Sequence, residues 1–228
     1  MNTISIVLPT LNEAESLPIV LGEIPKGIAM EVLVVDSGST DGTCALAEAG
    51  GARVVNEPQR GYGRACQTGL EAARGDIVVF LDADGADDPK ALPELLMLLE
   101  SGRADMALGS RLAGRKGPGA MPYHQWVGNF LAVALIRPLY GLALTDLSPF
   151  RAGRREKLLA LNLQEMTYGY PVEMIFRAAQ AGWRIVEVPV PYRKRIGGRS
   201  KITGTWSGSL KASIRIVLLI LQSRQKRA

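Results

Sequence analysis

The amino-acid sequence predicts an α/β fold in which a mostly parallel β-sheet is flanked by helices. Two kinds of segment alternate through the first half of the 228-residue chain. Short apolar runs rich in β-branched residues have the length and composition of strands that are buried on both faces, as in parallel sheets. These runs are Ile4–Leu8, Val32–Val35, Val54–Val55, Ile77–Leu81 and Met106–Leu108. The helix-like segments between them are Glu13–Glu23, Gly42–Ala49, Gly63–Ala73 and Pro89–Glu100.

Two helix starts in this half carry capping signals. Asn12 stands three residues before Glu15, and this spacing allows a capping box at a helix N-terminus. Pro89 follows Asp88 and suits the first turn of the next helix. We therefore expect helices to begin close to both positions.

The second half of the chain has longer loops. Two segments rich in glycine and basic residues, Gly109–Pro122 and Ile196–Gly204, predict loops of a length that is usually functional. Between these loops we expect three helices and one strand, at Trp126–Tyr140, Arg155–Leu161, Gly169–Ala181 and Ile185–Val190. The interpretation is a single domain over residues 1–204, followed by an amphipathic, basic C-terminal helix within residues 205–228.

Charge is distributed unevenly between the two halves. Of the 27 Lys/Arg and 22 Asp/Glu residues, 7 basic and 17 acidic ones lie in residues 1–110, and the remaining 20 and 5 lie in residues 111–228. An acidic half suits a metal ion, and a basic half suits phosphate groups or an anionic surface. The chain carries no nucleic-acid-binding motif, so we expect no nucleic-acid partner.

No segment predicts export or a membrane span. The N-terminus has no basic region followed by a long apolar run, and no stretch reaches the roughly 18 apolar residues of a transmembrane helix. The two cysteines, Cys44 and Cys66, lack the spacing of metal ligands or of a disulfide framework. We therefore expect a cytoplasmic protein.

The C-terminal tail has two interpretations. Leu210–Leu221 is apolar apart from Lys211 and Arg215, and further basic residues follow it. Such a helix would bind peripherally at the anionic inner face of a membrane. It would equally pack against the core or against a second copy of the chain in an oligomer.

Acidic residues follow three of the predicted strands. The first strand is followed by Pro9–Glu13, the second by Asp36–Gly42 and the fourth by Asp82–Asp84. Ligands of an open parallel sheet bind outside the carboxyl ends of its strands, so we expect these segments to meet at one edge. Carboxylates brought together repel each other unless a cation compensates. Mg²⁺ or Mn²⁺, held by one or two carboxylates and by diphosphate oxygens, would provide that compensation.

A purely local role for these acids is the alternative. Asp36 and Asp41 lie among turn-forming residues and would cap turns and helices. Asp82 and Asp84 form a strand-end Asp-x-Asp, which alone is a weak signal. The order and spacing of all three segments together favour ligand binding.

Further motifs in the second half extend this pattern into a family resemblance. In the first half the motifs are Pro9-x-x-Asn12-Glu13, Val34–Thr43 and Asp82-Ala83-Asp84. In the second half they are Gly109-Ser110-Arg111, Asp146–Arg151, Tyr168–Glu173 and Gly198–Ile202. This series resembles family 2 of the inverting glycosyltransferases, which have the Rossmann-like GT-A fold. Its order is similar to that of the polyprenyl-phosphate (dolichyl-phosphate) mannose and glucose synthases within the family.

The resemblance implies a nucleotide-sugar and metal half, residues 1–110, and an acceptor half, residues 111–204. The residues implied to bind the nucleoside are Pro9, Leu11, Glu13 and Asp36. Asp82 and Asp84 would bind the sugar nucleotide and Mg²⁺ or Mn²⁺. Arg111 would contact phosphate or sugar, and Asp146 would lie at the reacting centre. Arg199, Ser200 and Lys201 would fold over the diphosphate, whose departure is easier when its charge is neutralised.

The two kinds of acceptor differ in whether the reaction needs a base. The phosphate of a polyprenyl lipid attacks with an oxygen that is already anionic. A hydroxyl acceptor would instead need a carboxylate base, with Asp146 and then Glu173 as candidates. We therefore expect transfer of a hexose to polyprenyl phosphate, with a soluble phosphorylated or hydroxyl acceptor as the alternative.

Three positions depart from the family pattern. Ser37 stands where the family often has a second acid, and Ala86 stands where a polar metal ligand is common. His124-Gln125 lies in a region where lipid-phosphate synthases have a basic residue.

Two other functional classes follow from these observations. The substitutions at Ser37 and Ala86 are compatible with a catalytically dead protein that binds a sugar nucleotide, although Asp84 and Arg111 are retained. A nucleotidyltransferase would share the sheet and the acidic site. It would carry a glycine-rich first loop where this chain has Pro9–Glu13.

Overall fold

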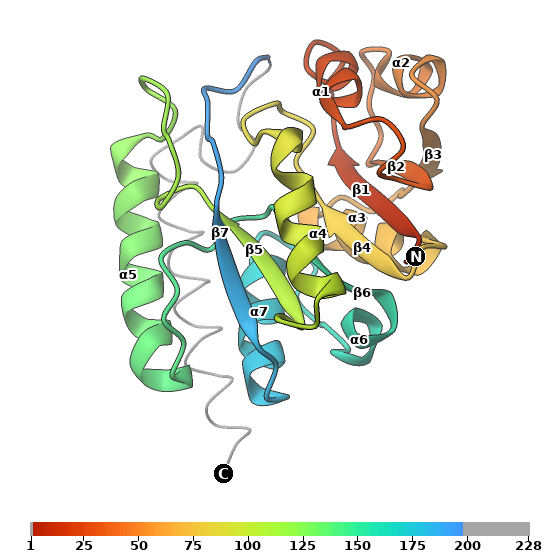
Figure 1. Ribbon diagram of the computed structural model, residues 1–228. Helices are drawn as coiled ribbons and strands as arrows, with labels where there is room; N and C mark the ends of the chain where they lie inside the picture. The colour runs from red at the N-terminus through yellow and green to blue at the C-terminus, as the bar shows by residue number, and fades with distance from the viewer. Residues whose placement is uncertain (1, 198–228) are drawn as a thin grey trace.

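The computed structural model describes residues 2–197, apart from the side chain of His124. Its centre is a seven-stranded sheet with the order β3-β2-β1-β4-β6-β5-β7 (Figure 1). The strands are β1 (Ile4–Thr10), β2 (Glu31–Asp36), β3 (Arg53–Asn56), β4 (Ile77–Phe80), β5 (Met106–Ser110), β6 (Arg151–Arg154) and β7 (Ile185–Pro189). Neighbouring strands are parallel except at β6, which is antiparallel to β4 and β5. The predicted α/β fold with a mostly parallel sheet is confirmed.

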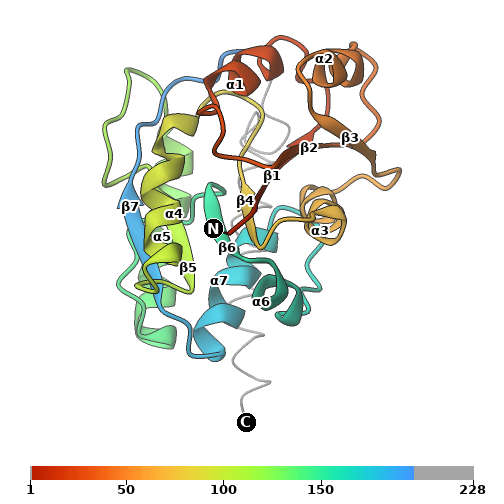
Figure 2. The same cartoon turned by 45° about the vertical axis from the view of Figure 1, so that its right-hand side comes forward.

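Helices cover both faces of this sheet (Figure 2). They are α1 (Leu17–Glu23), α2 (Thr43–Ala49), α3 (Tyr62–Ala72), α4 (Leu92–Glu100), α5 (Tyr123–Tyr140), α6 (Arg155–Ala160) and α7 (Tyr170–Gln180), with a 3₁₀ turn at Pro89–Ala91. Buried side chains of α1, α2 and α4 belong to one core, and those of α3, α5, α6 and α7 belong to another. The sheet separates these two cores.

Side chains along the central strands alternate between the two cores. In β1, Ile6 and Leu8 belong to the core beneath α1, α2 and α4, whereas Val7 belongs to the opposite core. In β4, Val79 and Phe80 are divided in the same way. Successive strand residues point to opposite faces, so a strand covered on both faces needs a continuous apolar run.

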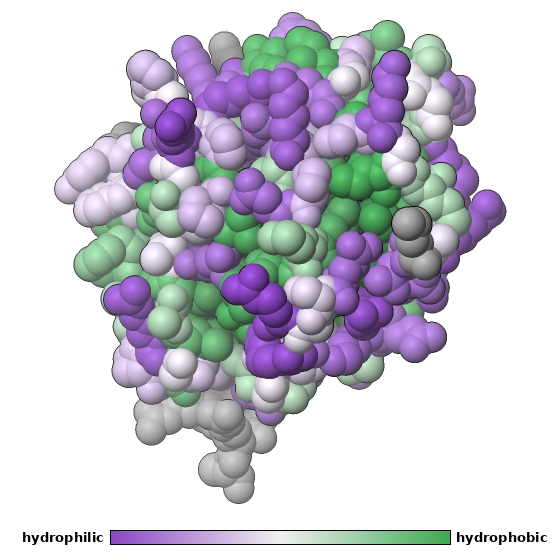
Figure 3. Space-filling model, viewed as in Figure 1, coloured by the Kyte–Doolittle hydropathy of each residue, from purple (hydrophilic) through white to green (hydrophobic). Residues whose placement is uncertain are grey.

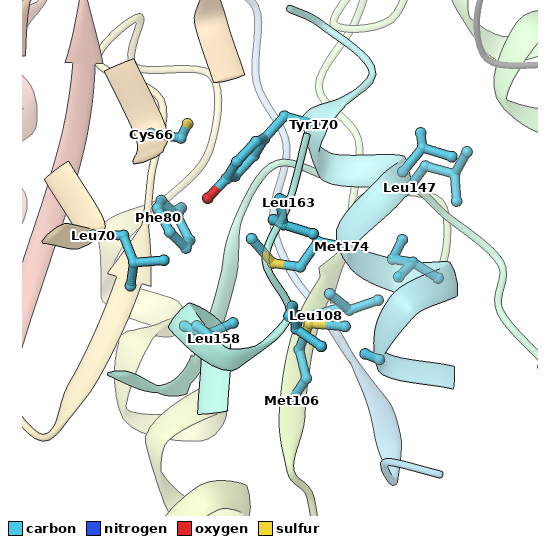
Figure 4. Close-up of a cluster of buried hydrophobic side chains, with 14 of the residues drawn as sticks. Cys66, Leu70, Phe80, Met106, Leu108, Leu147, Leu158, Leu163, Tyr170 and Met174 are labelled. Atoms are coloured by element: carbon cyan, nitrogen blue, oxygen red, sulfur yellow. The ribbon is translucent and has the colours of Figure 1, made fainter. Parts of the chain in front are cut away.

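One of these cores connects β4 to the start of α7. Figure 4 shows Cys66 and Leu70 of α3 close to Phe80 and Tyr170. The Phe80 and Tyr170 rings pack edge to face with their centroids 6.3 Å apart. Burial of an apolar side chain of this size contributes about 1.5–3 kcal/mol. This packing fixes α7 beside the strand that leads directly to Asp82.

The sequence does not predict β6, because Arg151–Arg154 contains neither an apolar run nor a β-branched residue. Its glycine has a packing role. The side chain of Leu158 in α6 lies 3.1 Å from where a Cβ of Gly153 would stand, so a larger residue would displace that helix. β6 fills the space between β4 and β5, both of which it pairs with.

The predicted capping box at Asn12 is wrong. Asn12 has a left-handed backbone with φ of 54°, and its Oδ1 accepts a hydrogen bond from the Thr40 amide at 2.8 Å. The helix begins only at Leu17, with Ser16 as its N-cap. The start expected at Pro89 is confirmed, since Asp88 accepts a hydrogen bond from the Lys90 amide at 3.0 Å.

α5 is the longest helix in the described part of the chain, with 18 residues. Across residues 2–197, no helix combines the length and apolar character that crossing a bilayer requires. The predicted domain boundary at residue 204, most of the loop Ile196–Gly204 and the tail Leu210–Leu221 lie outside the described residues.

Candidate active site

A cavity of about 620 Å³ opens at the carboxyl-terminal ends of the parallel strands. The segments that follow β1, β2, β4, β5 and β7 contribute to its lining, together with residues from or next to α3, α5 and α7. Six of the predicted site residues line it directly: Pro9, Leu11, Glu13, Asp82, Asp84 and Arg111. The structure therefore brings residues from both halves of the sequence to one site.

Asp36 lies at the end of β2, next to the cavity-lining Ser37. Its Oδ2 accepts hydrogen bonds from the amides of Gly38 and Ser39 at 3.0 and 2.9 Å. Its Oδ1 is buried and has no hydrogen-bond partner among the described residues. Asp36 thus shapes its turn and has one unused acceptor, whereas Asp41 accepts hydrogen bonds from Thr43 and from the Ala14 amide, which joins its turn to the segment after β1.

Glu13 is a buried residue in the cavity lining, and it forms an ion pair with another lining residue, Arg195. Its Oε1 lies 2.6 Å from Nη2 of Arg195, in the segment after β7. The same guanidinium nitrogen lies 3.7 Å from Oδ2 of Asp84. Arg195 therefore links the segments after β1 and β4. The sequence reasoning placed basic residues of this loop at Arg199 and Lys201, which lie outside the described residues together with Ser200.

Asp82 and Asp84 face the cavity from the end of β4. The Tyr62 hydroxyl donates to Oδ1 of Asp82 at 2.9 Å, and the Ala86 amide donates to Oδ1 of Asp84 at 2.9 Å. Burial, reinforced by the neighbouring Asp84 carboxylate, raises the pKa of Asp82 to about 7. The negative charges of the two acids are therefore only partly compensated by the groups around them.

This donor set fits a hard divalent cation that is shared with a ligand. Within residues 2–197, no three His, Cys, Asp or Glu side chains form a complete metal site. Mg²⁺ and Mn²⁺ accept one or two carboxylates and take their remaining ligands from phosphate oxygens and water. Asp82 and Asp84 can provide the carboxylates. Ala86 lines the cavity but contributes no side-chain ligand, because its methyl group has no donor atom.

Arg111 and Asp146 form a buried, bidentate ion pair on the other side of the cavity. Nε and Nη2 of Arg111 donate to the two carboxylate oxygens at 2.8 and 2.7 Å, and the Arg111 amide donates to Oδ2 at 2.8 Å. The guanidinium also lies over the Tyr192 ring, 5.2 Å from its centroid. Arg111 lines the cavity, whereas Asp146 lies behind it and fixes its direction.

Two residues that sequence reasoning missed hold the backbone around Asp146. Glu187 of β7 accepts hydrogen bonds from the amides of Thr145 and Asp146, each at 2.9 Å. Asn129 of α5 accepts from the Leu147 amide at 3.0 Å. Neither residue stands in a recognisable motif. Only the pairing of β7 with β5 places Glu187 beside this segment.

Glu173 does not reach the cavity. Its Oε2 accepts hydrogen bonds from the amides of Gln164 and Glu165 at 2.8 and 2.6 Å, and its Oε1 pairs with Nε of Arg177 at 2.8 Å. These bonds fix the loop before α7. The neighbouring Pro171 and Val172 line the cavity instead.

A further acid, Asp87, lines the cavity and was not among the predicted site residues. Its side chain is almost completely buried at 1% exposure, and Oδ1 has no partner among the described residues. Burial raises the pKa of Asp87 well above its ordinary value.

Comparison with known proteins agrees with this geometry. Residues 5–161 match the model of Glycosyl transferase family 2. An uncharacterised glycosyltransferase of Mycobacterium tuberculosis is 44% identical over 214 residues, which are 92% of this chain and 94% of that protein. The undecaprenyl-phosphate mannosyltransferase of Micrococcus luteus is 37% identical over 219 residues, covering 87% of this chain and 86% of that one.

A solved structure extends the similarity to the fold. It is glucosyl-3-phosphoglycerate synthase of Mycobacterium tuberculosis, in complex with Mn²⁺, UDP and glucosyl-3-phosphoglycerate. The similarity has a TM-score of 0.75 at 28% identity and covers 98% of this chain and 80% of the synthase. On the sequence match, the relatives and the fold, this chain belongs to glycosyl transferase family 2 and is a glycosyltransferase with the GT-A fold.

Proposed function

We propose that this enzyme transfers a hexose from a nucleotide-diphosphate sugar to the phosphate of a polyprenyl lipid, with inversion at the anomeric carbon. The proposal rests above all on the state of Asp146 and Glu173, the two carboxylates that the sequence suggests as a base. It draws further support from the apolar lining of the acceptor side and from the similarity to an undecaprenyl-phosphate mannosyltransferase.

The donor would lie along the edge formed by the ends of β2, β1 and β4. Asp36, with its unpartnered oxygen, and the cavity-lining Pro9, Leu11 and Glu13 would bind the nucleoside. Asp82 and Asp84 would hold Mg²⁺ or Mn²⁺ against the diphosphate. The ion would stabilise the charge that develops on the leaving diphosphate. Arg195 lies beside this position, and Arg199, Ser200 and Lys201 follow it in the chain.

The observation that carries the acceptor proposal is that both candidate bases are occupied. The two oxygens of Asp146 accept hydrogen bonds from Arg111, and Glu173 binds backbone amides and Arg177 away from the cavity. A hydroxyl acceptor needs a base within hydrogen-bond reach of its proton. A phosphate monoester carries an anionic oxygen at neutral pH, which can attack without first losing a proton to a base. The occupied carboxylates therefore favour an acceptor that is already anionic.

The acceptor side of the cavity has the polarity expected for a lipid. Its lining includes Ala132 of α5 together with Leu147, Pro149, Pro171 and Val172. The outer surface of α5 is also apolar: Tyr123, Phe130 and Leu131 are each more than half exposed. In Figure 3 the edge where α5 lies shows green and pale side chains interrupted by purple ones. Such a surface suits peripheral contact with a membrane that carries the lipid acceptor.

A soluble phosphorylated acceptor is the second candidate. It is favoured by the similarity to glucosyl-3-phosphoglycerate synthase, whose complex contains the product glucosyl-3-phosphoglycerate. Both candidates share an anionic nucleophile and the same donor side. They differ in what the apolar lining of the cavity would contact.

The experiment supplies both acceptors to the same enzyme. The protein is incubated with Mn²⁺, labelled UDP-glucose or GDP-mannose, and either polyprenyl phosphate in detergent or 3-phosphoglycerate. Label that passes into the organic phase only with the lipid supports the proposal. A labelled water-soluble product with no lipid product would overturn the lipid assignment. No transfer with either acceptor, despite donor binding, would favour a protein that only binds sugar nucleotides.

A further inference from the structure

Asp87 has an unusual position for a charged residue that no motif singles out. Its side chain is buried at 1% exposure, lines the cavity and leaves Oδ1 without any hydrogen-bond partner in the described part of the chain. A buried polar atom without a partner costs free energy of folding, and proteins retain few of them. Oδ1 of Asp87 is therefore an unused hydrogen-bond acceptor in the cavity lining.

The local roles of an acid do not account for Asp87. Its neighbour Asp88 performs the capping, because Asp88 Oδ1 accepts from the Lys90 amide at 3.0 Å. The charge of Arg111 acts to lower the pKa of Asp87, yet Nε and Nη2 of this guanidinium donate to the carboxylate of Asp146. Asp87 is thus neither a helix cap nor a bonded partner of that arginine.

The chemistry of the cavity narrows the class of ligand. A phosphate group needs cations around it, whereas the charges that act on Asp87 are those of Asp82, Asp84 and Asp146 and that of Arg111, which Asp146 already binds. Within residues 2–197 no three acids are grouped as a metal site, so Asp87 does not join Asp82 and Asp84 around one ion. A neutral group that donates hydrogen bonds, such as a sugar hydroxyl, meets neither objection.

The place of Asp87 along the sheet edge matches such a group. The edge runs from Asp36 at β2, through β1 and the pair Asp82 and Asp84 at β4, to Arg111 at β5. On the proposed function, a donor whose nucleoside lies near β2 and whose diphosphate lies near β4 has its hexose between β4 and β5. Asp87 lines the cavity close enough to Asp82, Asp84 and Arg111 for their charges to affect its pKa, and a backbone bridge joins it to Tyr192 after β7.

We propose that Asp87 recognises the donor sugar, with its carboxyl oxygen accepting a hydrogen bond from a hydroxyl group of the hexose. This contact would satisfy Oδ1 only when a sugar nucleotide is bound. A nucleoside diphosphate without the sugar would leave Oδ1 unpartnered. Asp87 thereby acts in recognition of the sugar and takes no part in holding the metal or the nucleoside.

The test compares ligands with and without the sugar. Calorimetry in the presence of Mn²⁺ measures the Kd of UDP and UDP-glucose, and of GDP and GDP-mannose, for the wild type and for Asp87→Leu. Leucine has the same branched heavy-atom skeleton with larger methyl groups in place of the oxygens, and it accepts no hydrogen bond. We expect the Kd of the productive sugar nucleotide to rise about tenfold and that of its nucleoside diphosphate to change by less than about twofold. Asp88→Asn, which changes the adjacent acid outside the cavity lining, should leave both constants unchanged.

A stability measurement separates this role from a structural one. Replacement of an unpartnered buried acid should raise the unfolding temperature of ligand-free Asp87→Leu by about 2 °C or more. If that variant does not fold, the isosteric Asp87→Asn provides the same comparison with a smaller loss of sugar affinity. Equal weakening of both ligands, unchanged binding of both, or loss of transfer with normal binding would each overturn the assignment. Failure of the wild type to bind any sugar nucleotide would instead overturn the proposed function.

Discussion

The donor side and the acceptor side of the cavity differ in how their charges are compensated. On the donor side, Asp36 and Asp87 each keep a buried oxygen without a partner among the described residues, and the pKa of Asp82 is raised to about 7. On the acceptor side, Arg111 and Asp146 satisfy each other through a bidentate pair. The donor side is therefore completed by its ligand, whereas the acceptor side is organised before any ligand binds.

This difference has a consequence for mutations. Removal of an acid from the donor side relieves repulsion, so function is lost while the fold is kept. Removal of one partner from the acceptor side leaves the other charge buried and uncompensated, so the fold itself is weakened. Four substitutions test the contrast, in order of decreasing expected effect.

The largest effect is expected from Asp84→Ala on the donor side. Loss of a carboxylate that holds the metal and the leaving diphosphate should reduce transfer by about 10³-fold and abolish metal-dependent nucleotide binding. The unfolding temperature should not fall, because Asp84 stands beside another acid. Turnover with labelled sugar nucleotide and thermal denaturation measure the two effects, with Asp88→Asn, which keeps the helix cap, as the control. Normal turnover of Asp84→Ala would show that the metal assignment is wrong.

Arg111→Ala tests the acceptor side. It leaves Asp146 buried without its partner, so the free energy of unfolding should fall by about 3–5 kcal/mol. Urea denaturation measures this loss. The double variant Arg111→Ala/Asp146→Ala removes both charges and should recover part of it. If the single variant is as stable as the wild type, the acceptor side is not preorganised by this pair.

Glu187→Gln makes a milder change to the same side. Glutamine keeps one carbonyl oxygen, which can accept from the Thr145 and Asp146 amides as Oε1 does, but its amide nitrogen cannot accept the bonds that Oε2 receives from the Thr145 amide and hydroxyl. Small displacement of Asp146 and Arg111 should lower kcat about tenfold and leave the KM for the donor unchanged. Steady-state kinetics with varied donor checks both constants. A raised KM with normal kcat would place the effect on the donor side instead.

Asp105→Asn provides a reference far from the cavity. Asp105 pairs with Arg184 and Lys157 at 3.0 and 2.7 Å, and these hydrogen bonds hold the pKa of its carboxyl well below the usual range. A lowered folded-state pKa stabilises the protein above the unfolded value of about 4 and loses that effect as the pH falls below it. Asp105→Asn should therefore cost about 1 kcal/mol at neutral pH. Urea denaturation at neutral and acidic pH should show the two proteins converging in acid, and a constant difference would contradict the assignment.

The fold could be predicted where burial dictates composition. The continuous apolar runs of β1 and β4 follow from packing on both faces, and the sequence shows them directly. β6 could not be predicted in this way. Its four residues are stabilised by pairing with β4 and β5 and by close packing at Gly153, all of which are long-range contacts.

The site was predictable where a polar residue directly follows a strand. Asp82, Asp84 and Glu13 have that position, and the structure brings them to one cavity. Asp87 could not be separated from Asp88, because two adjacent acids after a turn look alike until their burial and bonding are known. Glu187 belongs to a predicted strand, and only the neighbour of that strand reveals what its side chain contacts.

The reversed direction of β6 has an evolutionary consequence. The parallel strands bring side chains to the cavity where they finish, whereas the segment containing Asp146 reaches it just before β6 starts. Insertions or substitutions in the segment containing Asp146 would leave the carboxyl-terminal ends of β1, β2 and β4 in place. On the proposed function, donor choice and acceptor choice would then be encoded by separate stretches of the sequence. Substitutions before β6 would change the acceptor while the residues that bind the sugar nucleotide stay the same.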